Sequence, residues 1–199
     1  MKKVLLATAI VMAIGSTTAM AETEGGRINF EGLVSAETCQ KVVTSSVGSS
    51  DTDGTVTLDT AHVSDITAEV ADTTAGAKAE AFSIAIDCTD AGTSPAKASL
   101  TLSSSFSNTK GTLDNDETLS RNGEAAAKAV DIAVHRVADN TNALSLVKIN
   151  DPANAMEQAF TNNVATYNFK ASYVKSSDAG AEVTTGPVTT NAIYTFSYE

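Results

Sequence analysis

The sequence predicts an all-β protein, and three observations support this. Val, Thr, Ser and Ala are abundant while only 3 of 199 residues are Pro, a composition that favours strands. Short runs of alternating apolar and polar residues recur along the chain, separated by clusters of Gly, Asn, Asp and Ser. The chain also contains one pair of cysteines. Seven or so short strands with a cysteine pair are typical of an immunoglobulin-like sandwich.

The first 21 residues predict an export signal. Lys2 and Lys3 form a basic start, residues 4–14 form an apolar core, and residues 19–21 (AMA) form a small-residue cleavage site. A membrane anchor is the alternative, but the apolar core is shorter than the ~20 residues that a spanning helix needs. We therefore expect the mature chain to begin at Glu22, leaving 178 residues, a length that suits one domain.

The first predicted strand lies between Arg27 and Cys39. Its even positions are apolar or small, namely Ile28, Phe30, Gly32, Val34 and Ala36. Its odd positions are polar, with Leu33 as the exception. Period-2 alternation indicates an extended strand with one face available for burial. Because Gly weakens a strand, Gly32 suggests either a shallow facing groove or a β-bulge.

Further strands follow at short intervals. The expected runs are Thr55–Leu58, Ala81–Cys88, Ala98–Leu102, Val130–Val137, Ala143–Ile149, Val164–Val174 and Ala192–Tyr198. One face of the second run carries Phe82, Ile84, Ile86 and Cys88, and one face of the sixth carries Ala165, Tyr167, Phe169, Ala171 and Tyr173. We expect a surface loop over residues 44–54 and at most a turn or two of helix between residues 65 and 78.

Cys39 and Cys88 are expected to form a disulfide. An even cysteine pair in an exported chain is most simply a bridge, because the compartments outside the cytosol are oxidising. A metal site or a redox pair would need the short CxxC spacing, which is absent. The predicted position of Cys88 at the end of a core strand suits a buried bridge.

Charge and motifs argue against an enzyme or a nucleic-acid-binding protein. Removing residues 1–21 changes the formal net charge from −11 to −13, which repels nucleic acid and anionic lipid. His62 and His135 lack metal-ligand spacing and are expected at the surface, and the acidic residues 51–54 and 114–117 are expected in solvated loops. No catalytic residue, metal ligand or cofactor site is predicted.

The last predicted strand is unusually apolar for its position. Ala192, Tyr194, Phe196 and Tyr198 share one face, and only Glu199 follows. An apolar strand is normally covered by a neighbour, so we expect this strand to need a partner from elsewhere.

The two ends together resemble the pilins of bacterial chaperone–usher fimbriae. Gly186 stands fourteen positions from the end, counting Glu199 as the first, and the aromatic Tyr198 is penultimate. The N-terminal run GRINFEGLVSAETC is similar to the family pattern of Phe, Gly, Val and a following Cys, here at positions 30, 32, 34 and 39. The AFSIAIDC and FKASY segments also match in placement. The chain most resembles a type 1 fimbrial major subunit.

The resemblance implies an incomplete immunoglobulin-like sandwich that lacks its last strand. Residues 1–21 would be the signal peptide, residues 22–38 a donor-strand extension, and residues 39–199 the pilin domain. The donor face would be Ile28, Phe30, Gly32, Val34 and Ala36, and the groove that accepts a strand would involve Gly186, Ala192, Tyr194, Phe196 and Tyr198. In this family a periplasmic chaperone fills the groove first, and the extension of another subunit replaces it, an example of β-strand addition.

The implied function is that of a shaft subunit of a surface fimbrium that supports bacterial adhesion. Its partners would be identical or related pilins, the periplasmic chaperone and the outer-membrane usher. The mature chain would not insert into a membrane. A minor adaptor or terminator subunit is the alternative. A sugar-binding adhesin is less favoured, because 178 residues leave no room for a receptor domain and the chain lacks Trp.

Overall fold

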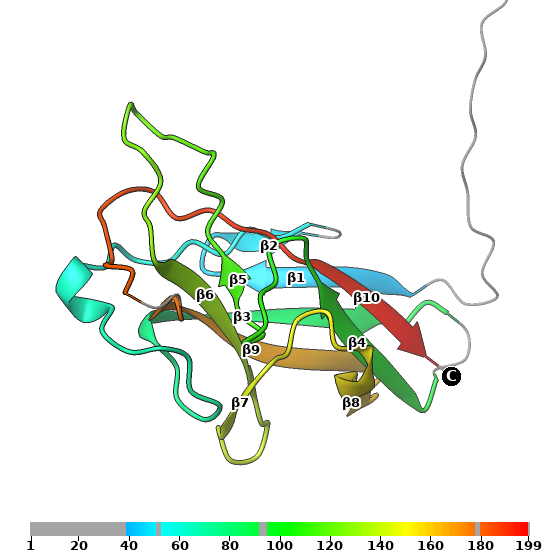
Figure 1. Cartoon of the computed structure of the whole chain (residues 1–199). Coiled ribbons are helices and arrows are strands. Elements are labelled where there is room, and N and C mark those ends of the chain that lie inside the picture. Colours follow the sequence, from blue (N-terminus) through cyan, green and yellow to red (C-terminus); the bar gives the residue numbers. More distant parts are fainter. Residues whose placement is uncertain (1–38, 51–52, 92–94, 178–179, 199) are drawn as a thin grey trace, which may run out of the picture. The chain divides into compact units, whose positions relative to one another are not determined.

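The computed structural model describes residues 39–50, 53–91, 95–177 and 180–198. The predicted signal (1–21) and extension (22–38) therefore lie outside the described residues. This part of the chain forms ten strands and two 3-10 turns, η1 (Val63–Asp65) and η2 (Pro152–Asn154), without an α-helix (Figure 1). The all-β prediction is confirmed. None of the described segments is a helix of the length and apolarity needed to cross a bilayer.

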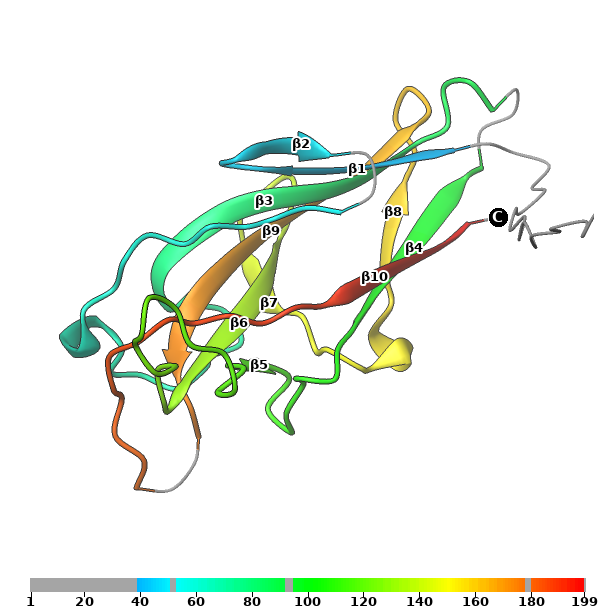
Figure 2. The same ribbon diagram turned by 90° about the horizontal axis from the view of Figure 1, so that it is seen from above.

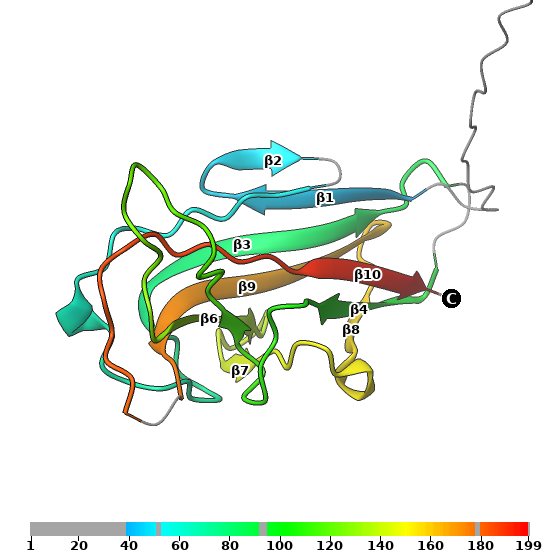
Figure 3. The same ribbon diagram turned by 45° about the horizontal axis from the view of Figure 1, so that its top comes forward.

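The larger sheet has the strand order β2-β1-β3-β9-β6-β5, with β7 also paired to β6. Its strands are β1 (Gln40–Ser45), β2 (Gly48–Ser50), β3 (Ala77–Asp87), β5 (Leu113–Asp114), β6 (Val130–Val137), β7 (Leu144–Leu146) and β9 (Val164–Lys175). All its pairs are antiparallel. Figure 3 shows the long strands β1, β3 and β9 side by side.

The smaller sheet has three antiparallel strands in the order β10-β4-β8. They are β4 (Lys97–Ser103), β8 (Met156–Ala159) and β10 (Ile193–Tyr198). Figure 2 shows β10 and β4 as neighbours. Side chains from both sheets meet in one core cluster, which includes Ile84, Tyr167 and Phe169 from the larger sheet and Leu100 and Leu102 from the smaller. Two sheets that bury a shared apolar layer form a β-sandwich.

The predicted inner faces are confirmed. Ile84, Ile86 and Cys88 on one strand are buried, and Phe82 packs at the margin of the core. On β9 the residues Ala165, Tyr167, Phe169 and Ala171 are buried, while Tyr173 is only partly buried. The rings of Phe82 and Phe169 stack with centroids 5.1 Å apart. Strict alternation therefore identified the core side of the two longest strands.

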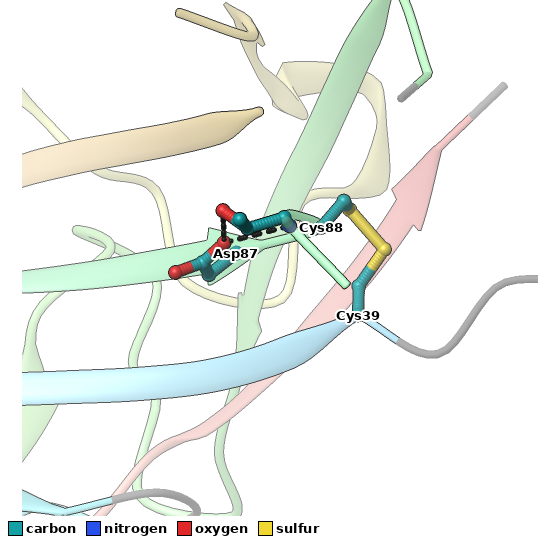
Figure 4. Close-up of a disulfide and its surroundings, with 4 residues drawn as sticks. Cys39, Asp87 and Cys88 are labelled. Carbon is teal, nitrogen blue, oxygen red and sulfur yellow. Dashed lines mark hydrogen bonds between the residues drawn. A yellow bond between two sulfur atoms is a disulfide. The ribbon is translucent and has the colours of Figure 1, made fainter. Parts of the chain in front are cut away.

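The predicted disulfide between Cys39 and Cys88 is present. Cys39 directly precedes β1 and Cys88 directly follows β3, so the bridge ties together one end of two paired strands (Figure 4). Beside it, Asp87 accepts hydrogen bonds from the hydroxyl and the backbone N–H of Thr89. These bonds lower the pKa of the Asp87 carboxyl.

Several predicted local elements are wrong. Residues 44–54 are not simply a loop, because β1 and β2 form a hairpin there. Thr55–Leu58 has the expected alternating burial but pairs with no strand in the described part of the chain. The helical turn lies at Val63–Asp65, ahead of the predicted range. The prediction also missed β5 and β8.

His135 is a buried residue, not a surface residue as predicted. It lies on the outer face of β6 with an exposed fraction of 0%, and its Nε2 atom is 2.8 Å from the carbonyl oxygen of Ala71. The covering segment is held by further bonds, since Leu146 N–H donates to Asp72 O and Gly76 N–H donates to Ser172 Oγ. A segment from elsewhere in the chain thus covers the outer face that was expected to meet solvent. His62, in contrast, is exposed as predicted.

Side-chain bonds close the sandwich on the β8 side. The Nη2 atom of Arg136 donates to the carbonyl oxygen of Glu157 at 2.9 Å and to Oε1 of Gln158 at 2.8 Å. Its guanidinium also lies over the Tyr167 ring, 5.7 Å from the centroid. Gln158 in turn donates to Asp139. Polar and charged side chains at a sheet margin discourage further strand pairing.

We expect Tyr167 to make the protein sensitive to alkali. Its hydroxyl donates to the carbonyl oxygen of Ala98 at 2.6 Å, and burial raises its pKa to about 12. Because the ordinary tyrosine pKa is about 10, the unfolded chain ionises first, so the free energy of unfolding should fall between pH 10 and 12 by roughly 2–3 kcal/mol.

Urea unfolding of the full chain at pH 8, 10 and 12 measures this effect. Tyr167→Phe is the matched variant. It should lose about 1 kcal/mol at pH 8, where the hydrogen bond is missing, and should show a smaller further loss at pH 12 than the unaltered chain. Equal alkaline losses in both proteins would exclude Tyr167 as the titrating group.

Candidate functional site

The edge of the smaller sheet formed by β10 is the candidate functional site. β10 pairs with β4 from Ile193 opposite Ser103 to Tyr198 opposite Ala98. On its other side, no strand among the described residues pairs with it. In an antiparallel pair the backbone N–H and C=O groups point alternately toward and away from the partner. β10 therefore presents a row of hydrogen-bonding groups that another strand can use.

An aromatic face accompanies this sheet edge. Tyr194, Phe196 and Tyr198 point to the core side but are only partly buried, and we call these three residues the aromatic edge. Their partners on β4, namely Leu102, Leu100 and Ala98, are buried. The Phe196 ring lies 5.8 Å from the rings of both Tyr167 and Tyr194, measured between centroids. The apolar layer is thus covered by β4 on one side of β10 and incompletely covered on the other.

Residues 53–58 pack beside β1 at the margin of the core. A Cβ at Gly54 would come within 2.1 Å of Cγ1 of Val43, so this segment passes directly against β1. Ser45 Oγ also donates to the carbonyl oxygen of Thr55. Val56 and Leu58 pack against the core but remain partly buried. The pKa of Tyr194 is raised by burial and then by the negative charge of Asp53.

The segment before β10 is fixed by Asn115. The Nδ2 atom of Asn115 donates to the carbonyl oxygens of Ala127 (2.7 Å) and Pro187 (3.2 Å), and its Oδ1 accepts from the N–H of Thr189. The Asn115 side chain is buried, which corrects the prediction that residues 114–117 form only a solvated loop. The rigid docking of residues 187–189 sets the position from which β10 starts.

Gly186 permits this docking. Its φ is +144°, and a Cβ there would lie 2.2 Å from the carbonyl oxygen of Ala125 and 2.6 Å from the backbone N of Ala127. Only glycine fits so close to another backbone at this φ. Gly186 and Ala192 lie ahead of β10 rather than within it, so Gly186 positions the edge strand from a distance.

The structure brings together part of the predicted site. Tyr194, Phe196 and Tyr198 share the core side of β10 as expected, whereas the predicted donor residues at positions 28, 30, 32, 34 and 36 lie outside the described residues. Sequence reasoning missed the contribution of Val56 and Leu58, although their alternation had marked them as apolar. It also missed Asn115, for which no local pattern gives a signal.

Other surface features of the described structure lie apart from β10. Two open hollows of about 400 Å3 occur in the described structure, one beside Arg136 and Asp139 and one beside Lys110 and Lys148. Neither includes β10. No group of three or more His, Cys, Asp or Glu side chains that could hold a metal is found among the described residues.

Comparison with known families decides the identity. A family model described as "Fimbrial protein" matches residues 28–199. The chain belongs to the fimbrial protein family. Its members are structural, non-enzymatic proteins, so this fimbrial protein is a pilin and not an enzyme. A search of curated proteins finds no match.

Solved structures agree with the fold of this fimbrial protein. The P pilus rod subunit PapA is 16% identical, with a TM-score of 0.51 over 74% of this chain and 94% of PapA. A chain from the structure of a chaperone–usher pilus is 17% identical, with a TM-score of 0.53 over 89% of this chain and 97% of that chain. At these identities the likeness establishes the pilin-type immunoglobulin-like fold.

Proposed function

We propose that this fimbrial protein is a shaft subunit of a surface fimbrium and that it polymerises by donor-strand complementation. The aromatic edge of β10 would accept the N-terminal extension of another copy, residues 22–38, while the chain's own extension enters the edge of a further copy. One observation carries the proposal, namely that the core-facing aromatic residues of β10 are only partly buried on a strand that forms the edge of the smaller sheet in the described structure. Such an edge is an aggregation hazard unless a strand covers it.

The extension has the chemistry to cover this edge. Its alternating face of Ile28, Phe30, Gly32, Val34 and Ala36 matches the period-2 face of β10. Burying Ile28, Phe30 and Val34 would contribute roughly 5–9 kcal/mol as an upper estimate. Backbone hydrogen bonds along the edge would add to this and would hold the two strands in register.

Other partners follow from the same edge. Before assembly, a periplasmic chaperone would supply a temporary strand to β10, and an outer-membrane usher would guide addition of the subunit. This requires export through the periplasm, which the predicted signal in residues 1–21 would direct. A chain with both an accepting edge and a donor extension fits the interior of a polymer, which favours a shaft subunit over a terminator.

Sheared surface fibres provide the test. We expect denaturing gels to show a ladder of multimers before acid treatment, collapsing to one dominant band of this chain afterwards. Donor-strand contacts are non-covalent, so acid and heat should release single subunits. If this chain is only a trace component of the fibres, it is an adaptor or terminator and the shaft assignment fails.

Deleting residues 22–38 separates the two roles of the chain. The variant should still accept a strand at β10 and so be recovered from the periplasm with its chaperone, but it should add to no other subunit. Surface fibre should fall to background. The matched control is a chain whose extension is replaced by a polar sequence of equal length, which should behave like the deletion. Normal fibres from either variant would contradict the proposal.

A further inference from the structure

Ile193 is an apolar residue on the solvent-facing side of β10. Its exposed fraction is 66%, and alternation along the strand puts it on the side opposite the aromatic edge. The surrounding outer positions on β10 and β4 are all hydroxyl residues: Ser99, Thr101, Ser103, Thr195 and Ser197. Ser103, directly opposite Ile193, gives it no apolar contact. Ile193 is therefore an exposed apolar side chain on the solvent side of β10, which is an edge strand in the described structure.

The N-terminal extension also has one apolar residue, Leu33, on its otherwise polar face. Within residues 27–37 its odd positions are polar or charged except for Leu33. When the even positions face the core, Leu33 faces solvent, on the same side as Ile193. Directly opposed side chains on one face of an antiparallel pair are in contact. Each of these apolar residues departs from the polar pattern of its own strand face, and each can cover the other between copies.

Resting on the proposed function, we propose that Leu33 of one copy packs against Ile193 of the next, and that this pair sets the register in which the extension adds to β10. The direction is antiparallel, as in every strand pair of the described structure. The occupant of the edge is residues 28–34 of a second copy. The pair is a register-determining contact on the solvent face, distinct from the apolar contacts toward the core.

The core-facing residues are compatible with this register. With Leu33 opposite Ile193, Phe30 stands opposite Phe196, Ile28 opposite Tyr198, and Gly32 opposite Tyr194. Two large apolar residues then meet aromatic rings, and the residue without a side chain meets Tyr194. A parallel strand aligned on the same pair would place Val34, Ala36 and Thr38 against the aromatic edge and would bury less apolar surface.

Neighbouring registers leave both residues uncovered. Side-chain parity permits only shifts of two residues. One shift places Ser35 opposite Ile193 and the other places Glu31 there. A charged or hydroxyl side chain beside Ile193 forfeits the apolar contact, and Leu33 would then meet Thr195 or a position ahead of β10.

Cysteine cross-linking in the assembled fibre tests this register. The full chain with Leu33→Cys and Ile193→Cys should form a covalent ladder of multimers after mild oxidation, resistant to acid and heat and collapsing on reduction. Directly opposed positions lie within disulfide reach, whereas diagonal positions at about 7–8 Å do not. The matched variants, Ser35→Cys or Glu31→Cys with Ile193→Cys, should give no ladder, and neither should the single variants.

Each alternative outcome has a defined meaning. A ladder only from a matched variant would place the extension in a shifted register and overturn the proposal. A cross-linked monomer without a ladder would mean that the extension occupies its own edge, which also overturns it. If unaltered fibres show an acid-sensitive ladder but no cysteine pair cross-links, the register fails while the proposed function stands. If unaltered chain forms no polymer, the proposed function itself fails.

A double-mutant cycle provides a second test that does not need added thiols. It compares Leu33→Thr, Ile193→Thr and the variant that carries both substitutions. Each single change should speed heat-induced release of subunits from the fibre by about two- to five-fold, and the double change should add nothing beyond the single changes. Independent, multiplicative effects would show that the two side chains do not touch, and would overturn the proposal.

Discussion

Replacing Gly186 by Ala should destabilise the protein by roughly 2–5 kcal/mol and remove most assembled fibre. The new Cβ would lie 2.2 Å from the carbonyl oxygen of Ala125 and 2.8 Å from the carbonyl carbon of Ala126. These are backbone atoms, which cannot rotate away as a flexible side chain can. The cost combines overpacking with a strained positive φ. Relief requires residues 186–189 to lift from Asn115, which would displace the start of β10.

Gly123→Ala is the matched control. Gly123 also has a positive φ, +83°, but a Cβ there would meet no atom within 4 Å. This substitution should therefore cost only about 1 kcal/mol, from the backbone conformation alone. Urea unfolding of both full-length variants measures the difference, and the amount of surface fibre reports the functional effect. Similar losses in the two variants would mean that the close approach of the 125–127 backbone is not what requires glycine at position 186.

The fold was predictable where alternation is regular. β3, β9 and β10 have long period-2 patterns, so their core sides were assigned correctly from the sequence, including the aromatic edge. The β1–β2 hairpin was missed because its Ser- and Gly-rich segment has the composition of a loop. Pairing of β1 with the neighbouring strand β3 outweighed the loop-like composition of this segment.

The rest of the site depends on distant contacts that no local pattern records. His135 is buried because the segment near Ala71 crosses the outer face of β6, and Asn115 is buried because residues 187–189 return to it. The difference between the two edges of the smaller sheet also arises from tertiary contacts. Arg136 closes the β8 side by bonding to β8, whereas β10 has no comparable cover among the described residues. Under the proposed function, this difference would direct strand addition to β10.

The disulfide between Cys39 and Cys88 should contribute about 4 kcal/mol to stability. It closes a loop with a sequence separation of 49 residues, and the chain-entropy model gives this magnitude for such a loop. The contribution is large because a domain of this kind is stable by only about 5–15 kcal/mol in total. Cys39→Ala with Cys88→Ala should therefore lower the urea midpoint strongly.

The position of the disulfide also matters for the proposed function. Cys39 is the first described residue after the proposed donor extension, and the bridge fixes it to Cys88 at the end of β3. A pull on the extension in a fibre would therefore act on a covalently anchored strand rather than on the end of β1. We expect the reduced, unaltered chain to lose most of the same stability, and the double variant to have a slightly lower urea midpoint, because Cys88→Ala also removes a buried sulfur atom. A double variant within 1 kcal/mol of the oxidised protein would show that hydrogen bonds between β1 and β3 alone suffice to hold the origin of the extension.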